Sequence, residues 1–132
     1  DGRIVVHREY RYLFDRISLG FPSGGIEVNQ TPDQAAKAEL KEESGYNAGA
    51  LEKIQEVAPE NGLFLEYMHV FLATKLVAGK MKLDEFESIE PVILSVDEVD
   101  KAIQSGEIWD GRTIAAWCLV RQRVVDFIEK KL

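Results

Sequence analysis

The sequence predicts an α/β domain in which a mixed β-sheet packs between helices. Strand-like and helix-like segments interleave along the chain, and at least one strand pair has antiparallel character. Two capping boxes, at Thr31 to Gln34 and at Ser95 to Glu98, mark where helices begin. A length of 132 residues suits one domain with one adequate core. No repeat, low-complexity tract or linker divides the chain, so we expect a single domain over residues 1–132.

The first part of the chain predicts two strands. Ile4 to His7 is a short apolar strand, and Tyr10 to Phe14 extends or follows it. Asp15-Arg16 marks a turn, after which Ile17 to Leu19 alternates toward a glycine-containing loop. Because the chain starts abruptly at Asp1-Gly2, as if within a fold, the sequence leaves open a preceding N-terminal segment.

The clearest helix lies between Thr31 and Gly45. Thr31 is a good N-cap, Pro32 suits the first helical position, and Gln34 completes the capping box. Gly45 ends the helix as a C′ residue. The stretch from Phe21 to Gly25 is turn-forming. This region therefore predicts a loop, a helix of about three turns and a second loop.

The middle of the chain is expected to contain two more strands. Leu51 to Val57 is a twisted strand and Pro59 to Gly62 is a loop. Leu65 to Val77, rich in β-forming residues, is a long strand that Ala78 to Lys80 breaks. Leu83 to Ser88 then forms an acidic loop.

A short strand and a helix come next. The strand runs from Pro91 to Leu94, with Pro91 at its start, where a missing N–H donor is tolerated. Ser95 opens a helix that continues through Ile103 and closes at Gly106.

A long helix ends the chain. Asp110-Gly111 is a turn, and Thr113 caps the helix. Cys118 lies in the apolar run from Ile114 to Val120, so we expect a buried, unreactive thiol. The apolar positions predict a stripe that faces the core: Ile114, Trp117, Leu119, Val120, Val124, Phe127 and Ile128.

Charge and composition exclude several partners. The net charge of −7 argues against general nucleic-acid binding, which needs a basic face. A phosphorylated small substrate stays compatible, because a bound cation can reverse the local field. The apolar run before Arg121 and Arg123 is too short to span a membrane, and no signal peptide is visible. With one cysteine, no intrachain disulfide can form, so a reducing compartment, the cytoplasm, is expected.

Three carboxylates on the first helix are the strongest functional feature. Glu39, Glu42 and Glu43 fall within an arc of about 100° on an α-helix. Like charges so placed repel by roughly a few tenths of a kcal/mol per pair. Mg²⁺ prefers oxygen ligands and bridges carboxylates to substrate phosphates. The pattern alone is compatible with a solvated acidic face or with a metal site.

The stretch from Gly24 to Tyr46 resembles the Nudix box, G-x5-E-x7-R-E-U-x-E-E-x-G-U, in which U is apolar. The positions that fit in register are Gly24, Glu39, Leu40, Glu42, Glu43, Gly45 and Tyr46. Gln30 stands where the pattern has Glu, and Ala38 stands where it has Arg. The resemblance implies the Nudix α/β/α sandwich, again with a mixed β-sheet between helices.

Flanking segments resemble the ADP-ribose pyrophosphatase branch of that family. Arg8 to Tyr12 is similar to its R-Q-Y-R-Y, and Gly20 to Gly24 is similar to its E-L-P-A-G, with Gly20 in place of Glu. Pro59 matches a proline that follows the box. Leu83 to Glu87 resembles the acidic loop, and Ser105 to Ala115 the C-terminal stretch. These matches cover nearly the whole chain and favour this branch over the nucleoside triphosphate branch.

Carried across by position, the resemblance implies a site for Mg²⁺ or Mn²⁺. The implied metal ligands are the carbonyl of Ser23 and the carboxylates of Glu39, Glu42, Glu43 and Glu87. Glu85 and Glu87 share the roles of base and ligand, and the implied catalytic residues are Glu85 and Glu42. The implied substrate contacts are Arg8, Arg11, Gly24 and Gly25, although a solvated edge strand would also explain the arginines.

No Ser-His or Cys-His arrangement is apparent. His7 and His69 are expected to be structural, because each lies in a strand-like apolar run.

The resemblance implies hydrolysis of the pyrophosphate bond of ADP-ribose, or a related nucleoside diphosphate sugar, by metal-activated water. ADP-ribose would give AMP and a sugar phosphate. The alternative is a weak or inactive Nudix domain that binds a nucleotide ligand, because Gln30, Ala38 and Gly20 alter the surroundings of the ligands. The Glu of the pattern is replaced by Gln30 and its Arg by Ala38. Because the acidic and the basic residue are lost together, the two would have formed an ion pair in the family pattern. Dimers are usual in this branch, and the segment from Tyr10 to Phe14 would suit a homodimer interface. The sequence does not fix the base or the sugar.

Overall fold

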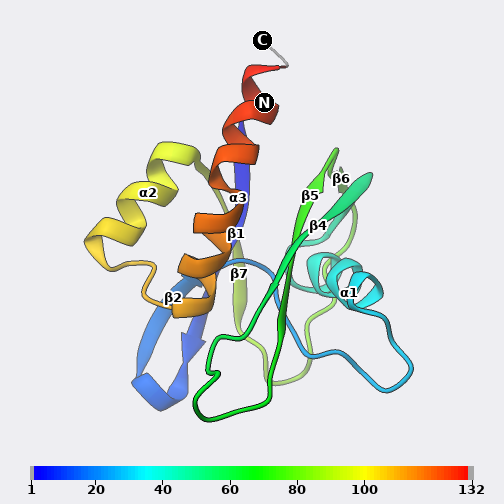
Figure 1. Ribbon diagram of the computed structural model, residues 1–132, viewed down its shortest axis with the longest axis vertical. Coiled ribbons are helices and arrows are strands. Elements are labelled where there is room, and N and C mark those ends of the chain that lie inside the picture. Colours follow the sequence, from blue (N-terminus) through cyan, green and yellow to red (C-terminus); the bar gives the residue numbers. More distant parts are fainter. Residues whose placement is uncertain (1, 131–132) are drawn as a thin grey trace.

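A computed structural model describes residues 2–130. In chain order its elements are β1 (Arg3–Arg11), the 3₁₀-helix η1 (Tyr12–Phe14), β2 (Arg16–Gly20), α1 (Pro32–Ser44), β3 (Tyr46–Asn47), β4 (Ala50–Val57), β5 (Met68–Thr74), β6 (Val77–Ala78), β7 (Ile89–Ser95), α2 (Val96–Ser105) and α3 (Gly111–Glu129). The strands lie between α1 on one side and α2 and α3 on the other (Figure 1). This arrangement confirms the α/β class.

The described strands form three antiparallel sheets. β1 is the central strand in the order β2-β1-β7, β4 pairs with β5, and β3 pairs with β6. Because each strand pair within residues 2–130 is antiparallel, the arrangement differs in this respect from the mixed sheet expected. A short hairpin around η1 joins β1 to β2, and such tight connections enforce antiparallel pairing.

The core lies where β1, β2 and β5 meet α2 and α3. Its buried members are Val6, Leu19, Val70, Val99, Ala102, Ile108, Trp117, Val120 and Val124. The predicted stripe on α3 is largely confirmed, since Trp117, Val120 and Val124 are buried and Ile114, Leu119 and Ile128 pack against them. This core fixes β1 against α3, and β1 also carries residues of the candidate site.

Both predicted capping boxes are present. The Thr31 side chain accepts from the N–H of Gln34, and the Gln34 side chain accepts from the N–H of Thr31. Ser95 and Glu98 repeat this exchange at α2. Gly45 ends α1 with φ of 75°, which a residue without a side chain adopts at little cost.

The start of α3 corrects one expectation. Asp110, not Thr113, is the N-cap, and Gly111 is the first helical residue. The Oδ2 atom of Asp110 accepts 2.9 Å and 2.6 Å hydrogen bonds from the N–H and Oγ1 of Thr113. Aspartate is a strong N-cap because its carboxylate satisfies free N–H groups of the first turn.

Two strands differ from their predicted bounds. The long strand is shorter, because Leu65 is 94% exposed and Lys75 takes φ of 54°, which is incompatible with extended backbone. Val77–Ala78 consequently pairs with β3 instead of continuing β5. Pro91 lies inside β7 and not at its start, which is tolerated because β7 is an edge of its sheet.

The thiol of Cys118 is exposed, which corrects the expectation of a buried residue. The apolar run is longer than the stripe that α3 buries, and Cys118 faces away from the stripe. None of the helices within residues 2–130 combines the length and apolar content that a bilayer crossing requires.

Candidate active site

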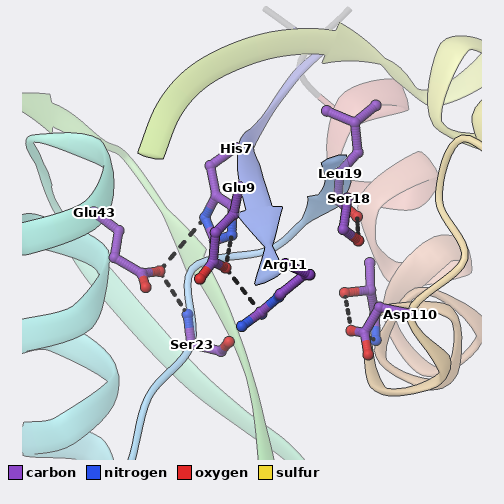
Figure 2. Close-up of polar contacts among 9 residues, drawn as sticks. His7, Glu9, Arg11, Ser18, Leu19, Ser23, Glu43 and Asp110 are labelled. Atoms are coloured by element: carbon purple, nitrogen blue, oxygen red, sulfur yellow. Dashed lines mark hydrogen bonds and ion pairs between the residues drawn. The ribbon is translucent and has the colours of Figure 1, made fainter. Parts of the chain in front are cut away.

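The centre of the site is the carboxylate of Glu43 in the last turn of α1. Glu43 is only 5% exposed. Its Oε2 atom accepts a 2.8 Å hydrogen bond from the N–H of Ser23, in the loop that follows β2 (Figure 2). The loop and the helix end are therefore joined through one buried acidic side chain.

Gly24 brings the same loop against Glu39, one turn earlier on α1. A Cβ atom at Gly24 would lie 2.1 Å from Oε1 of Glu39 and 2.2 Å from its Cδ. Any larger residue at this position would therefore force the end of the Glu39 side chain to move aside. No comparable constraint exists at Gly25, where a Cβ would meet nothing within 4 Å.

The acidic loop between β6 and β7 lies near these carboxylates. Glu87 accepts a 2.9 Å hydrogen bond from the N–H of Asp84, which holds its side chain against a turn of the loop. The charge of Glu87 contributes to the raised pKa of Glu39 and of Glu43. Glu85 is exposed and is not among the charges that raise those two pKa values.

The strand β1 contributes three alternate residues, which share one face because a strand has a period of two. His7 is 3% exposed and lies between two carboxylates: its Nδ1 atom is 3.5 Å from Oε2 of Glu43, and its Nε2 atom is 3.6 Å from Oε2 of Glu9. Arg11 pairs with the same Glu9 oxygen at 2.9 Å. Figure 2 shows His7, Glu9 and Arg11 in one row beside Glu43.

Arg8 lies on the opposite face of β1. It is 3.9 Å from Glu90 and lines a cavity of about 350 Å³ together with Glu98 and Lys101 of α2. The structure thus separates Arg8 from the acidic cluster, whereas it places Arg11 beside that cluster.

Burial and mutual repulsion perturb the site electrostatically. Burial raises the pKa of Glu43 to about 8, and Glu39 and Glu9 add repulsion. Burial also raises the pKa of Glu39, with the charge of Glu42 as the next cause. Burial, followed by the Arg11 charge, lowers the pKa of His7 to about 4, so its imidazole is neutral at pH 7. His7 therefore supplies no positive charge to Glu43, and the positive charge of Arg11 is directed at Glu9.

Such a cluster fits a hard divalent cation, which takes carboxylate and carbonyl oxygens as ligands. The side chains are not yet gathered into a ligand set: within residues 2–130, no three His, Cys, Asp or Glu side chains form a group that could hold a metal ion as placed. Binding would therefore require Glu39, Glu43 and the acidic loop to move closer together.

Most of the residues implied by the sequence are near one another, but not all. Ser23, Gly24, Glu39, Glu43, Glu87 and Arg11 belong to the cluster. Glu42 is exposed, yet its negative charge contributes, after burial, to the raised pKa of Glu39. His7 and Glu9 were missed as site residues, although the alternation of His, Glu and Arg along one strand face could have indicated them.

The two positions that depart from the Nudix pattern have local roles in the structure. The Oε1 atom of Gln30 accepts a 3.0 Å hydrogen bond from the N–H of Glu27, which stabilises the loop before α1. Ala38 is partly buried and brings no charge to Glu39.

Comparison with known proteins gives a consistent result. A family model described as the NUDIX domain matches residues 1–117. The chain is 33% identical over 118 residues to the ADP-ribose pyrophosphatase of Bacillus subtilis, covering 88% of this chain and 64% of that protein. It is 26% identical over 122 residues to the ADP compounds hydrolase NudE of Escherichia coli, covering 92% of this chain and 66% of that protein.

Two further comparisons extend this picture. The GDP-mannose pyrophosphatase of Salmonella typhimurium is 31% identical over 93 residues, covering 68% of this chain and 49% of that protein. A crystal structure of an ADP compounds hydrolase superposes with a TM-score of 0.86 at 25% identity, covering 96% of this chain and 68% of that one. The chain thus spans about two thirds of the length of its first relatives.

Proposed function

Since the chain belongs to the Nudix family, we propose that it hydrolyses the pyrophosphate bond of ADP-ribose or a related nucleoside diphosphate sugar. The observation that carries the proposal is the buried Glu43, held by the loop at Ser23 and adjacent to Glu39 and Glu87. A buried carboxylate beside further acidic side chains is costly unless a cation compensates it. The names of the relatives, which refer to ADP-ribose, ADP compounds and GDP-mannose, support the substrate class.

We propose Mg²⁺ or Mn²⁺ as the cofactor. Glu39, Glu43 and the carbonyl of Ser23 would hold it, with Glu42 and Glu87 nearby. Such an ion, when bound, neutralises phosphate charge and lowers the pKa of water.

The chain's own residues perform the other steps of the proposed mechanism. Arg11, whose side chain is 47% exposed, would contact a substrate phosphate. Glu87 or Glu85 would accept the proton of the attacking water. The loop at Gly24 and Gly25 would position the pyrophosphate beside Glu39.

A second candidate is a domain that binds a nucleotide without turning it over efficiently. It is favoured by the absence of a preassembled ligand group within residues 2–130 and by Ala38, which supplies no positive charge beside Glu39. Changes around ligands reduce metal affinity or activity by about 10- to 100-fold.

A substrate panel separates the two candidates. The chain is incubated with ADP-ribose, GDP-mannose and other nucleoside diphosphate sugars, with Mg²⁺ and with Mn²⁺, and a phosphatase then releases phosphate from the monoester products. Calorimetry measures ligand binding in parallel. Hydrolysis supports the first candidate; binding without hydrolysis supports the second. If no sugar nucleotide is bound or cleaved, the substrate assignment is wrong.

We propose a homodimer in the cytoplasm. The dimer is supported by the exposed apolar side chains of η1, since Tyr12, Leu13 and Phe14 are 77%, 79% and 67% exposed. The location is supported by the single cysteine, which cannot form an intrachain disulfide. Sedimentation of the purified chain tests the dimer directly.

A further inference from the structure

His7 is an unusual buried residue because it faces two acidic side chains and completes a hydrogen bond with neither. Its Nδ1 atom is buried and has no hydrogen-bond partner among residues 2–130, although Oε2 of Glu43 is only 3.5 Å away. Leaving a buried polar atom unpaired is unfavourable, so such atoms in native proteins usually have a role. The atom is directed into the acidic cluster (Figure 2).

A neutral imidazole has one N–H, so it can donate to only one of its two carboxylate neighbours. Glu9 already receives a charged donor, because Arg11 approaches its Oε2 atom at 2.9 Å. Among residues 2–130, Glu43 accepts a hydrogen bond only from the N–H of Ser23. When a bound cation keeps Glu43 ionised, the proton of His7 is therefore better placed on Nδ1, where it faces Glu43, than on Nε2, where it would face Glu9.

Both contacts to Glu43, from Ser23 and from His7, end on the same oxygen, Oε2. If the 3.5 Å approach of Nδ1 closes to a hydrogen bond, Oε2 is held from two sides, rotation of the carboxylate is restricted, and Oε1 is the oxygen left for another ligand. A side chain that orients a metal-binding carboxylate raises metal affinity without touching the metal.

We propose that His7 is a positioning residue: its Nδ1–H holds Oε2 of Glu43 so that Oε1 faces the divalent cation, and the Glu9–Arg11 pair fixes the tautomer. The inference rests on the proposed metal site and deepens it. Since His7 touches neither substrate nor metal, its effect appears first in metal affinity.

Two substitutions of His7 separate positioning from simple packing. In H7N the amide nitrogen lies near the place of Nδ1 and retains a donor toward Glu43. In H7Q the amide nitrogen reaches the place of Nε2 and donates toward Glu9 instead. Calorimetric titration with Mn²⁺, without substrate, gives the affinity of each variant. We expect H7N to bind close to the wild-type value and H7Q to bind about tenfold more weakly or worse.

H69Q is the matched control. His69 is also largely buried, and it pairs with Glu56 of β4 at 3.0 Å, so the same chemical change there should leave Mn²⁺ affinity unchanged. Thermal unfolding of all variants without metal reports any loss of stability.

A measurement on the wild-type chain tests the tautomer without any variant. In the presence of saturating Mg²⁺, which keeps Glu43 ionised, the ¹⁵N chemical shifts of His7 should show a protonated Nδ1 and an unprotonated Nε2. An Nε2–H tautomer overturns the proposal, as do equal Mn²⁺ affinities for H7N and H7Q. If the wild-type protein binds no Mn²⁺, both the metal site and this inference are overturned. If the wild-type protein binds Mn²⁺ but H7N and H7Q have equal affinities, only the inference is overturned.

Discussion

The main-chain N–H of Ser23 donates a 2.8 Å hydrogen bond to Oε2 of Glu43, across 20 positions of sequence. This bond joins the loop after β2 to the final turn of α1. The backbone of Ser23 and the carboxylate of Glu43 are thus held together. A change at Glu43 should therefore affect both metal binding and the order of the loop.

Replacing Glu43 with glutamine should remove most metal-dependent activity. The amide carries no charge and offers one weaker oxygen, so we expect Mg²⁺-dependent hydrolysis to fall by more than about 100-fold. Initial rates across a Mg²⁺ titration measure the effect. Glu60, exposed in the loop before β5, provides the control, and E60Q should retain the wild-type rate. Full E43Q activity at limiting Mg²⁺ would show that α1 does not bind the metal.

The same substitution should stabilise the metal-free protein at high pH. The pKa of Glu43 is raised by burial to about 8 in the folded state, above its ordinary value of 4.5. A raised pKa contributes stability below the unfolded pKa, and that contribution is lost as pH rises through the folded pKa. Chelator-treated wild-type protein should therefore lose stability between pH 4.5 and pH 8, and E43Q should lose less. Thermal unfolding at pH 5 and pH 9 checks this; a larger E43Q benefit at pH 5 would contradict it.

Glu87 should matter more for turnover than Glu85. Both side chains are exposed, but only the charge of Glu87, not that of Glu85, contributes to the raised pKa of Glu39. If Glu87 accepts the proton or binds the cation in the transition state, E87Q should lower kcat by about 100-fold or more, with a smaller effect on KM. E85Q, the same change two residues earlier, should have little effect. Unchanged kcat in both variants would remove the loop from the mechanism.

Restoring the two missing residues of the Nudix box should act cooperatively. If Gln30 and Ala38 replace a former ion pair, Q30E and A38R together should raise metal affinity by more than the sum of the single effects. We expect a coupling of about 0.5 kcal/mol or more, since each charge alone lacks its partner. Mn²⁺ titration of the wild type, the two single variants and the double variant completes the double-mutant cycle. Additive effects would mean that the two positions are independent.

Asp100 should stabilise the contact between α2 and α3 in a pH-dependent way. Its Oδ1 accepts from Trp117 at 2.8 Å, and its Oδ2 from Arg121 at 2.7 Å. The hydrogen bond from Arg121 lowers the pKa of Asp100 below 3.8. A lowered pKa contributes stability above the unfolded pKa, and that contribution is lost as pH falls through the folded value.

D100N should accordingly lower Tm at pH 7 by about 3 °C, and the deficit should shrink below pH 3.8. Thermal unfolding at both pH values measures this. D126N, on the exposed face of α3, should change Tm little. If D100N lowers Tm equally at pH 7 and pH 3, the charge of Asp100 does not contribute to stability.

Local signals in the sequence were sufficient for most elements. Thr31, Ser95 and Gly45 act within one turn of their own position, so capping could be inferred without knowledge of the fold. The end of β5 could not, because the left-handed backbone at Lys75 depends on the loop at Gly49, whose N–H donates to the Lys75 carbonyl. Asp110 and Thr113 are both good caps, and only the structure shows which one is used.

The site was predictable where its residues lie close together in sequence. Glu39 and Glu43 share a helix face, and that spacing indicates them directly. His7 and Glu9 come from a distant strand, and their role depends on how β1 packs against α1. Arg8 and Arg11 looked equivalent in the sequence, but strand alternation directs only Arg11 toward the cluster.

The close approach of Gly24 to Glu39 has a consequence for the range of residues that evolution or a mutant library can accept. Any side chain at position 24 begins with a Cβ atom that would overlap the Glu39 carboxyl group. Alanine at position 24 would therefore shift the end of the Glu39 side chain without altering the charge of the protein. In a saturation library scored for growth or turnover, every substitution at position 24, alanine included, should therefore lower activity through the displaced Glu39 carboxylate.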